Sequence, residues 1–119
     1  MASKRIEIYQ CPSHLIIHLK RFKHQTPTLF TAASKKLTNL VSFPVEGLDL
    51  HEYAANGGVY DLYAVSNHTG NLKNGHYTAY CLNPINRNWY LFDDHKVTPV
   101  AAEKVVTKQA YVLFYKLRN

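Results

Sequence analysis

A histidine and an aspartate in this chain have the residue types of a general base and of the group that orients it. His76 lies in the stretch Gly-His-Tyr-Thr-Ala-Tyr, and Asp93 lies in the stretch Trp-Tyr-Leu-Phe-Asp-Asp. A thiol or hydroxyl becomes a strong nucleophile when a neighbouring imidazole takes its proton. A carboxylate improves that imidazole because it fixes the tautomer and the ring plane. The two residues therefore resemble two of the three groups of a nucleophilic hydrolase.

The segments around this pair predict a β-hairpin that brings the two side chains together. Residues 77–82 and 88–92 have strand character and flank a stretch of turn-forming residues. If the loop consists of residues 83–86, His76 faces Asp93 directly, with Cβ atoms about 4.5–5.5 Å apart. From spacing alone, a structural cross-strand pair is an alternative to a catalytic one.

A register slip of one residue would bring Asp94 opposite the histidine, so Asp94 is the reserve partner. The nucleophile has no clear candidate. Cys81 lies five residues from His76 along the same predicted strand, on the opposite face and about 16 Å away. Cys11 fits the commoner role of an inert, buried thiol.

The composition describes one globular domain and excludes several classes of protein. The 119 residues are 46% hydrophobic and 13% aromatic, which suffices for a sizeable core. No apolar run is long enough to span a membrane, and no secretory signal is apparent. Two cysteines do not make a disulfide framework, so we expect a reduced, cytoplasmic or nuclear protein. The net charge of +6 is scattered, which favours solvent-exposed charges over a nucleic-acid surface.

The pattern of apolar residues predicts a mainly β protein, an antiparallel sheet with little helix. The predicted strands are 5–9, 15–22, 35–43, 59–65, 77–82, 88–92, a short strand near residue 97, and 110–116. Residues 23–34 and 66–75 are polar and read as long loops. Residues 48–53 read as one helical turn, and residues 101–106 as the only sizeable helix.

Several motifs in one order resemble the ubiquitin-specific proteases. The motifs are PSHLIIHLKRF (12–22), YAVSNH (63–68), GHYTAY (75–80), WYLFDD (89–94) and AYVLFY (110–115). The resemblance covers the chain from about residue 4 to residue 117. It implies an α+β parent fold, of which this chain resembles the sheet part called the palm.

The resemblance also implies a function. Members of this family are papain-like thiol proteases that cleave the isopeptide or peptide bond after the C-terminal glycine of ubiquitin. By resemblance, His76 is the general base, Asp93 orients it and Asp94 assists. Tyr77 resembles an aromatic residue beside the ubiquitin tail. Loops 23–34 and 66–75 resemble the two loops that close over the tail, which makes Asn67, His68 and Gly75 candidate substrate-binding residues.

The departures from the family pattern limit this reading. The cysteine box, roughly G-L-x-N-x-G-N-x-C-Y-M, is absent, and so are the two C-x-x-C pairs that bind zinc. Residues 1–119 therefore resemble the C-terminal portion of the catalytic domain, with no metal or cofactor expected. We expect the chain to be inactive alone, with ubiquitin and the missing N-terminal half as partners and no nucleic acid or membrane as a partner.

Two alternatives to part of an active enzyme remain at this stage. One is a non-catalytic ubiquitin-binding or scaffold remnant. Another is a basic, nucleic-acid-binding β module, which rests on charge alone. We also expect half of a catalytic domain to expose apolar sheet surface, which invites homodimerisation.

Overall fold

The computed structural model describes residues 11–24, 34–54, 56–71 and 73–118. Their elements, in chain order, are β1 (His14–His18), β2 (Phe22–His24), β3 (Ser34–Lys36), β4 (Leu48–Asp49), β5 (Val59–Gly70), β6 (Gly75–Leu82), β7 (Trp89–Asp93), β8 (Lys96–Val100), a 3₁₀ turn η1 (Ala102–Lys104) and β9 (Ala110–Leu117). Within these ranges no helix is long and apolar enough to cross a membrane.

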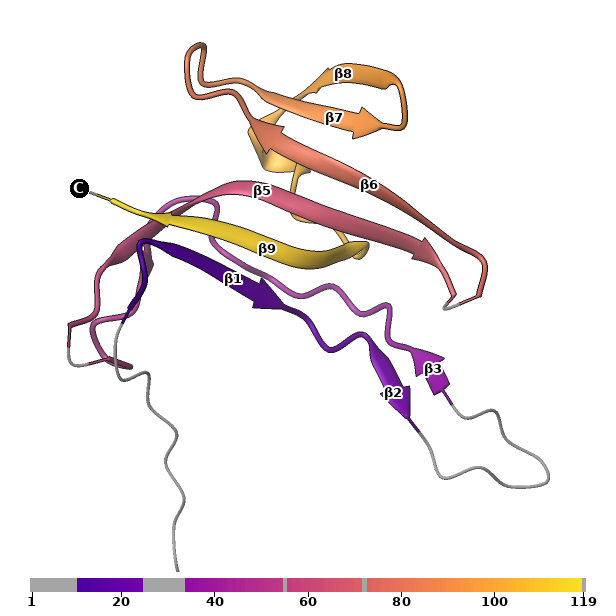
Figure 1. Cartoon of the computed structure of the whole chain (residues 1–119), viewed down its shortest axis with the longest axis horizontal. Helices are drawn as coiled ribbons and strands as arrows, with labels where there is room; N and C mark the ends of the chain where they lie inside the picture. The colour runs from indigo at the N-terminus through magenta and orange to yellow at the C-terminus, as the bar shows by residue number, and fades with distance from the viewer. Residues whose placement is uncertain (1–10, 25–33, 55, 72, 119) are drawn as a thin grey trace, which may run out of the picture.

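One antiparallel sheet dominates the molecule (Figure 1). The strand order is β1-β9-β5-β6-β7-β8, with the short β4 also paired to β5, and β2 and β3 form a separate hairpin. The two long strands β5 and β9 lie side by side in the middle of the sheet. The prediction of a mainly β, antiparallel fold with little helix is confirmed, since η1 is the only helical element in the described residues.

One face of the sheet carries the core. The large side chains of β5 and β9 that are buried most completely are Tyr60, Leu62, Val65, Leu113 and Tyr115. Within each strand they are two residues apart, the spacing that places side chains on one face, except between Leu62 and Val65, where a register shift adds one residue. The chain between β3 and β4 runs back across this face (Figure 1) and contributes Phe43 to the core.

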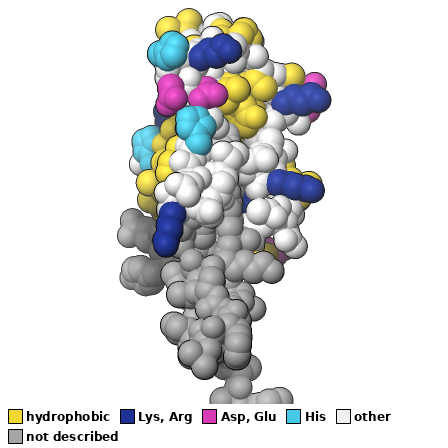
Figure 2. Space-filling model, turned by 90° about the vertical axis from the view of Figure 1, so that its right-hand side faces the viewer, with side chains coloured by type: hydrophobic (Ala, Val, Ile, Leu, Met, Phe, Trp, Pro, Cys, Tyr) yellow, Lys and Arg dark blue, Asp and Glu magenta, His cyan; other side chains and the backbone are white. Residues whose placement is uncertain are grey.

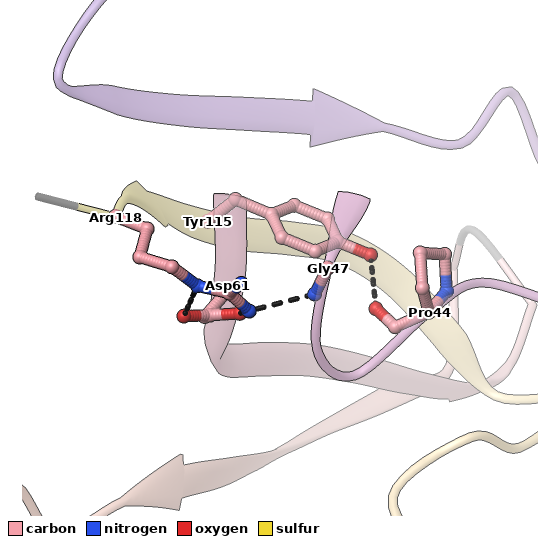
Figure 3. A network of polar contacts seen from close by, with 5 residues as sticks. All are labelled: Pro44, Gly47, Asp61, Tyr115 and Arg118. Carbon is pink, nitrogen blue, oxygen red and sulfur yellow. Dashed lines mark hydrogen bonds and ion pairs between the residues drawn. The ribbon is translucent and has the colours of Figure 1, made fainter. Parts of the chain in front are cut away.

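Polar bonds hold that returning chain on the sheet (Figure 3). The buried hydroxyl of Tyr115 donates to the carbonyl of Pro44 at 2.7 Å. The backbone N–H of Gly47 donates to Asp61, which also receives two bonds from the guanidinium of Arg118. Arg118, directly after β9, and Gly47, directly before β4, are thereby both bonded to the same strand, β5.

The opposite face of the sheet leaves apolar side chains in contact with solvent. The side chain of Ile16 in β1 is 63% exposed, and Val97 in β8 is 51% exposed. Phe92, the ladder partner of Val97, is 40% exposed. The predicted self-association through such a surface stays a prediction.

Several predicted strands and helices end elsewhere in the structure. The predicted strand 35–43 is wrong beyond residue 36, because the following segment leaves the β2–β3 hairpin to cover the core. The predicted helical turn 48–53 is wrong at its start, where Leu48 and Asp49 pair with β5, but residues 50–53 form one hydrogen-bonded turn, in which the N–H of Tyr53 donates to the carbonyl of Leu50. The predicted helix 101–106 is one 3₁₀ turn. The predicted strand 15–22 is interrupted after residue 18.

The two predicted loops are also shorter than their composition indicated. Residues 66–70 continue β5, since all of them pair with β6 and residues 66 and 67 also pair with β9, so the loop prediction for 66–75 is wrong over most of its length. Ladder pairing overrides the turn preference of the residues there. Residues 23, 24 and 34 belong to the β2–β3 hairpin, which contradicts the ends of predicted loop 23–34. Residues 25–33 and the predicted strand 5–9 lie outside the described residues.

Candidate active site

The hairpin of β6 and β7 forms as predicted, but its register is shifted by two residues. Leu82 pairs with Trp89 and Ala79 with Phe92, so the loop contains residues 83–88 rather than 83–86. The cause lies in the loop, where Arg87 adopts a left-handed backbone conformation with φ 62°. The prediction that His76 lies directly opposite Asp93 is therefore wrong.

The shift nevertheless keeps the two side chains on one face of the sheet. Successive side chains alternate between the faces, so a slip of two residues preserves the face and a slip of one would not. His76 and Asp93 become diagonal neighbours, a separation that long side chains bridge. The Nε2 atom of His76 lies 2.8 Å from Oδ1 of Asp93, which is a hydrogen bond. The pairing that the sequence predicted is present, by a different geometry.

The hydrogen bond determines what the imidazole can do. When the ring is neutral and its Nε2–H donates to Asp93, the lone pair of His76 is at Nδ1. Nδ1 is then the atom that can accept a proton from a nucleophile. The bond to Asp93 raises the pKa of His76 above its ordinary value, with smaller contributions of the same sign from the charges of Asp93 and Asp94. The pair is about half exposed, at 49% for the His76 side chain and 45% for Asp93.

Asp94 lies beside the pair but not opposite the histidine. It begins the tight turn between β7 and β8 in a left-handed conformation, with φ 52°. His76, Asp93 and Asp94 each offer a nitrogen or oxygen within 4.8 Å of the others, a spacing that a metal ion also accepts. In the structure, Nε2 of His76 bonds to Asp93 instead. Figure 2 shows acidic side chains gathered with histidines at one edge of the molecule, beside an apolar patch.

The residue before the histidine is a glycine for a steric reason inside the protein. A Cβ on Gly75 would lie 2.0 Å from Nε2 of His68 and 2.9 Å from the backbone oxygen of Asn71. The chain's own His68 ring makes this close approach to the backbone of residue 75.

His68 and Tyr77 form an aromatic group on the opposite face of the sheet from the pair, since Tyr77 directly follows His76 along β6. They are ladder partners on β5 and β6, and their ring centroids are 4.8 Å apart. The His68 ring also lies 5.8 Å from that of Tyr111 in β9. His68 is 3% exposed whereas Tyr77 is 56% exposed, so the buried ring of His68 supports the exposed ring of Tyr77. The interpretation of His68 as a residue of a flexible loop is wrong.

Asn67 is also buried in a strand rather than placed in a loop. It is 3% exposed, and its Nδ2 donates to the hydroxyl of Thr78, its ladder partner, at 3.4 Å. Thr78 lies on the same face as His76, and the register of the hairpin places it opposite Asp93. Sequence reasoning missed Thr78, although its position two residues after His76 indicated the shared face. Tyr111 was missed because only the β5–β9 pairing brings it here.

Neither cysteine reaches the pair. Cys81 pairs with Tyr90 and lies on the opposite face of β6 from His76. Burial raises the pKa of the Cys81 thiol, which reduces its thiolate fraction. Cys11 lies next to the start of β5, where Tyr60 bonds to Pro12, about 30 Å along the strand from the partner of His76. The expected placement of Cys81 on the opposite face is confirmed, and Cys11 is partly rather than fully buried.

Comparison with known proteins places this site in a family. A family model described as ubiquitin carboxyl-terminal hydrolase matches residues 1–115. Ubiquitin carboxyl-terminal hydrolase 2 of Gallus gallus is 45% identical over 120 residues, which are 98% of this chain and 32% of that protein. The Homo sapiens protein of the same name is 45% identical over 119 residues, 98% of this chain and 19% of that protein.

Solved structures agree with the sequence comparison. A chain of the Ubp8-Sgf11-Sgf73-Sus1 SAGA DUB module matches with a TM-score of 0.82 and 33% identity, over 95% of this chain and 26% of that one. A chain of the same module bound to ubiquitin aldehyde matches with a TM-score of 0.82 and 31% identity. The chain thus spans a third or less of the proteins it matches. It belongs to the ubiquitin carboxyl-terminal hydrolase family.

Proposed function

We propose that this chain supplies the general base, His76, and the orienting carboxylate, Asp93, for thiol-dependent cleavage of the bond after the C-terminal glycine of ubiquitin. The observation that carries the proposal is the 2.8 Å hydrogen bond between Nε2 of His76 and Oδ1 of Asp93. That bond leaves Nδ1 as the proton acceptor, which is the arrangement that a thiol nucleophile requires. Family membership supplies the substrate class.

The reaction is an acyl transfer in two steps. Nδ1 of His76 takes the proton of a cysteine thiol, and the thiolate attacks the carbonyl carbon of the last glycine of ubiquitin. The imidazolium then protonates the leaving amine, and a thioester remains. In the second step His76 takes a proton from water, which hydrolyses the thioester. Asp93 stabilises the imidazolium in both steps, and Asp94 adds a second negative charge nearby.

The cysteine comes from a polypeptide segment outside these 119 residues. Cys81 is on the wrong face of β6, and Cys11 is too far along the sheet. The 119 residues also contain no Asn-x-Cys sequence. By this proposal the chain works with a second segment, which makes the isolated chain inactive.

Ubiquitin is the proposed partner. A relative of this chain has been solved in a module bound to ubiquitin aldehyde. The exposed ring of Tyr77, one residue after His76, provides an apolar surface for a narrow chain such as a Gly-Gly tail. His68 holds that ring in place. Tyr77 and His68, and Asn67 on the other face of the sheet, are the proposed substrate-binding residues, together with the backbone of Gly75.

A chimaera tests the catalytic proposal. Residues 1–119 replace the matching segment of the human relative, ubiquitin carboxyl-terminal hydrolase 2, which they match at 45% identity. We expect the chimaera to hydrolyse ubiquitin that carries a fluorogenic amide at its C-terminus. The His76→Ala variant should lose activity by about 10³-fold or more, because the members of such a triad act as a unit.

His95→Ala is the matched control, because His95 is an exposed histidine in the turn after β7 and makes no bond to His76. This control variant should hydrolyse the fluorogenic ubiquitin amide at a rate within about twofold of that of the parent chimaera. A folded chimaera whose His76→Ala variant is as active as the parent would refute the role of His76. Labelling of the isolated chain by a ubiquitin C-terminal activated ester would contradict the proposal that the nucleophilic cysteine lies outside these 119 residues.

A second function, ubiquitin binding without turnover, is favoured by the lack of a thiol near His76 in the described residues. It predicts that the isolated chain binds ubiquitin in a titration and that Tyr77→Ala weakens this binding. No binding by a folded chain would eliminate this second function and leave the first one standing.

A further inference from the structure

Arg21 is a buried cation whose hydrogen-bonding capacity is only partly used. Its side chain is 3% exposed. Nε donates to the carbonyl of Ala110 at 2.9 Å, and Nη1 donates to the carbonyls of Leu37 and Asn39. Nη2 is buried and has no acceptor among the described residues. Two N–H groups of a charged side chain are therefore unsatisfied inside the protein.

No counter-charge accompanies this cation in the part of the chain that the structure describes. Its three acceptors are all neutral backbone carbonyls. Burial lowers the pKa of Arg21, and no carboxylate opposes that effect. A buried charge without a partner is strongly unfavourable, and buried charges in proteins are generally paired or bonded to a ligand. The missing component is an anionic acceptor.

A cavity of about 250 Å³ adjoins Arg21. Its lining residues are Leu19, Lys20, Arg21, Leu37, Asn39 and Val41. Cavities for drug-sized molecules measure about 300–1,000 Å³, so this one suits a smaller group, the size of a phosphate or an acidic side chain. Lys20 adds a second positive charge, and none of the lining residues is acidic.

We propose that this cavity binds a single oxyanion group, a carboxylate or a phosphate, with Nη2 of Arg21 as the principal donor. Charge-assisted bonds from a guanidinium to such oxygens are the strong ones. The exposed ammonium of Lys20 adds electrostatic attraction at the mouth of the cavity. Leu37 and Val41, which are 39% and 37% exposed, are the side chains free to shift as the anion reaches Nη2. The site shares no residue with the His76–Asp93 pair.

An NMR titration of the isotope-labelled 119-residue chain tests the proposal directly. Inorganic phosphate and acetate are added separately, with sodium chloride at matched ionic strength as the reference. We expect saturable shifts of the Nε–H signal of Arg21 and of the amides of Leu37 and Asn39. The amide of Lys104, in η1, should not shift. Whether acetate or phosphate binds more tightly identifies the carboxylate or the phosphate as the preferred group.

Two variants decide between a specific site and general charge attraction. Lys20→Gln should weaken binding about threefold to fivefold, the effect of one exposed charge, whereas Lys104→Gln should not change it. Arg21→Gln should abolish the shifts of Leu37 and Asn39 if the variant folds. If Arg21→Gln does not fold, the comparison of Lys20→Gln with Lys104→Gln still distinguishes a specific site from general charge attraction. Equal shifts with chloride, or equal affinity in both lysine variants, would overturn the proposal.

Discussion

The imidazole of His68 occupies the space that a side chain on residue 75 would need. A Cβ on Gly75 would lie 2.0 Å from Nε2 of His68, and real carbon–nitrogen contacts do not come this close. Gly75 directly precedes His76 on β6, so the backbone at the proposed base is set by how His68 packs. The movement of the His68 ring is restricted, because it packs against the rings of Tyr77 and Tyr111, which also contact each other.

Gly75→Ala should therefore destabilise the fold by about 1–3 kcal/mol, the usual cost of overpacking a buried site. It should also displace His76 and lower activity in the chimaera described above. Chemical denaturation measures the first effect, and hydrolysis of the fluorogenic ubiquitin amide measures the second.

The control for this change is the double variant His68→Ala/Gly75→Ala. Removal of the ring removes the clash, so Gly75→Ala should cost less in the His68→Ala background than in the parent. The remaining cost reports the contact of 2.9 Å with the backbone oxygen of Asn71. Equal costs in both backgrounds would show that His68 is not the reason for the glycine.

Asp93→Asn should lower the pKa of His76 toward its ordinary value of 6.5. The hydrogen bond to the Asp93 carboxylate is the largest cause of the raised pKa, and an amide cannot stabilise the imidazolium in the same way. NMR of the His76 ring protons against pH measures the change. Asp94→Asn is the matched control and should have the smaller effect, since Asp94 acts only through its charge. A larger shift in Asp94→Asn would exchange the roles of the two aspartates.

The same pair gives a pH dependence to stability. The pKa of His76 is raised in the folded state, so the folded protein binds the proton of His76 more tightly than the unfolded chain does. The stabilisation is fully present below pH 6.5 and is lost as the pH rises through the raised pKa. Denaturation midpoints between pH 5 and pH 8 should show this loss in the parent, and Asp93→Asn should flatten it. If the pH dependence of stability were the same in Asp93→Asn as in the parent, the bond between His76 and Asp93 would not be its cause.

Tyr115→Phe should destabilise the protein by about 1 kcal/mol, the net contribution of one buried hydrogen bond. The hydroxyl donates to the carbonyl of Pro44 at 2.7 Å, in a side chain that is 1% exposed. Burial raises the pKa of Tyr115 to about 12, so the hydroxyl stays a donor over the whole physiological range. Tyr90→Phe is the control, because its hydroxyl accepts only an exposed bond from Asn86. Thermal unfolding distinguishes the two variants.

Asp61→Asn should loosen the end of β9, where Asp61 holds both Arg118 and the backbone of Gly47 (Figure 3). The bond from Arg118 lowers the pKa of Asp61. The stabilisation is therefore present above the ordinary carboxyl pKa of 3.8 and is lost as the pH falls through the lowered value. At pH 7 we expect a fall in the unfolding midpoint of no more than about 4 °C, because the side chains of Arg118 and Asp61 are 50% and 32% exposed and water weakens the attraction between them. Faster hydrogen exchange of the amides of residues 116–118 would locate the effect.

The period-two patterns of the sequence determined the fold class and the central strands. Aromatic and β-branched residues are concentrated in the segments that became β5, β6, β7 and β9, as is typical of strands with a buried face. The same alternation determined that His76 and Asp93 share a face, which holds for any register shifted by an even number of residues. The family motifs determined which chemistry the pair resembles.

The tertiary structure decided the features that depend on partners far along the chain. Residues 66–70 have loop composition, and only their pairing with β6, together with that of residues 66 and 67 with β9, makes them strand. Residues 37–43 have strand composition, and the need to cover Tyr115 and its neighbours takes them out of the sheet. The contact between His68 and Gly75, and the burial of Arg21 beneath three carbonyls, likewise arise only once distant strands pair. Local sequence sets which face a side chain takes, whereas the pairing of distant strands sets what that side chain meets.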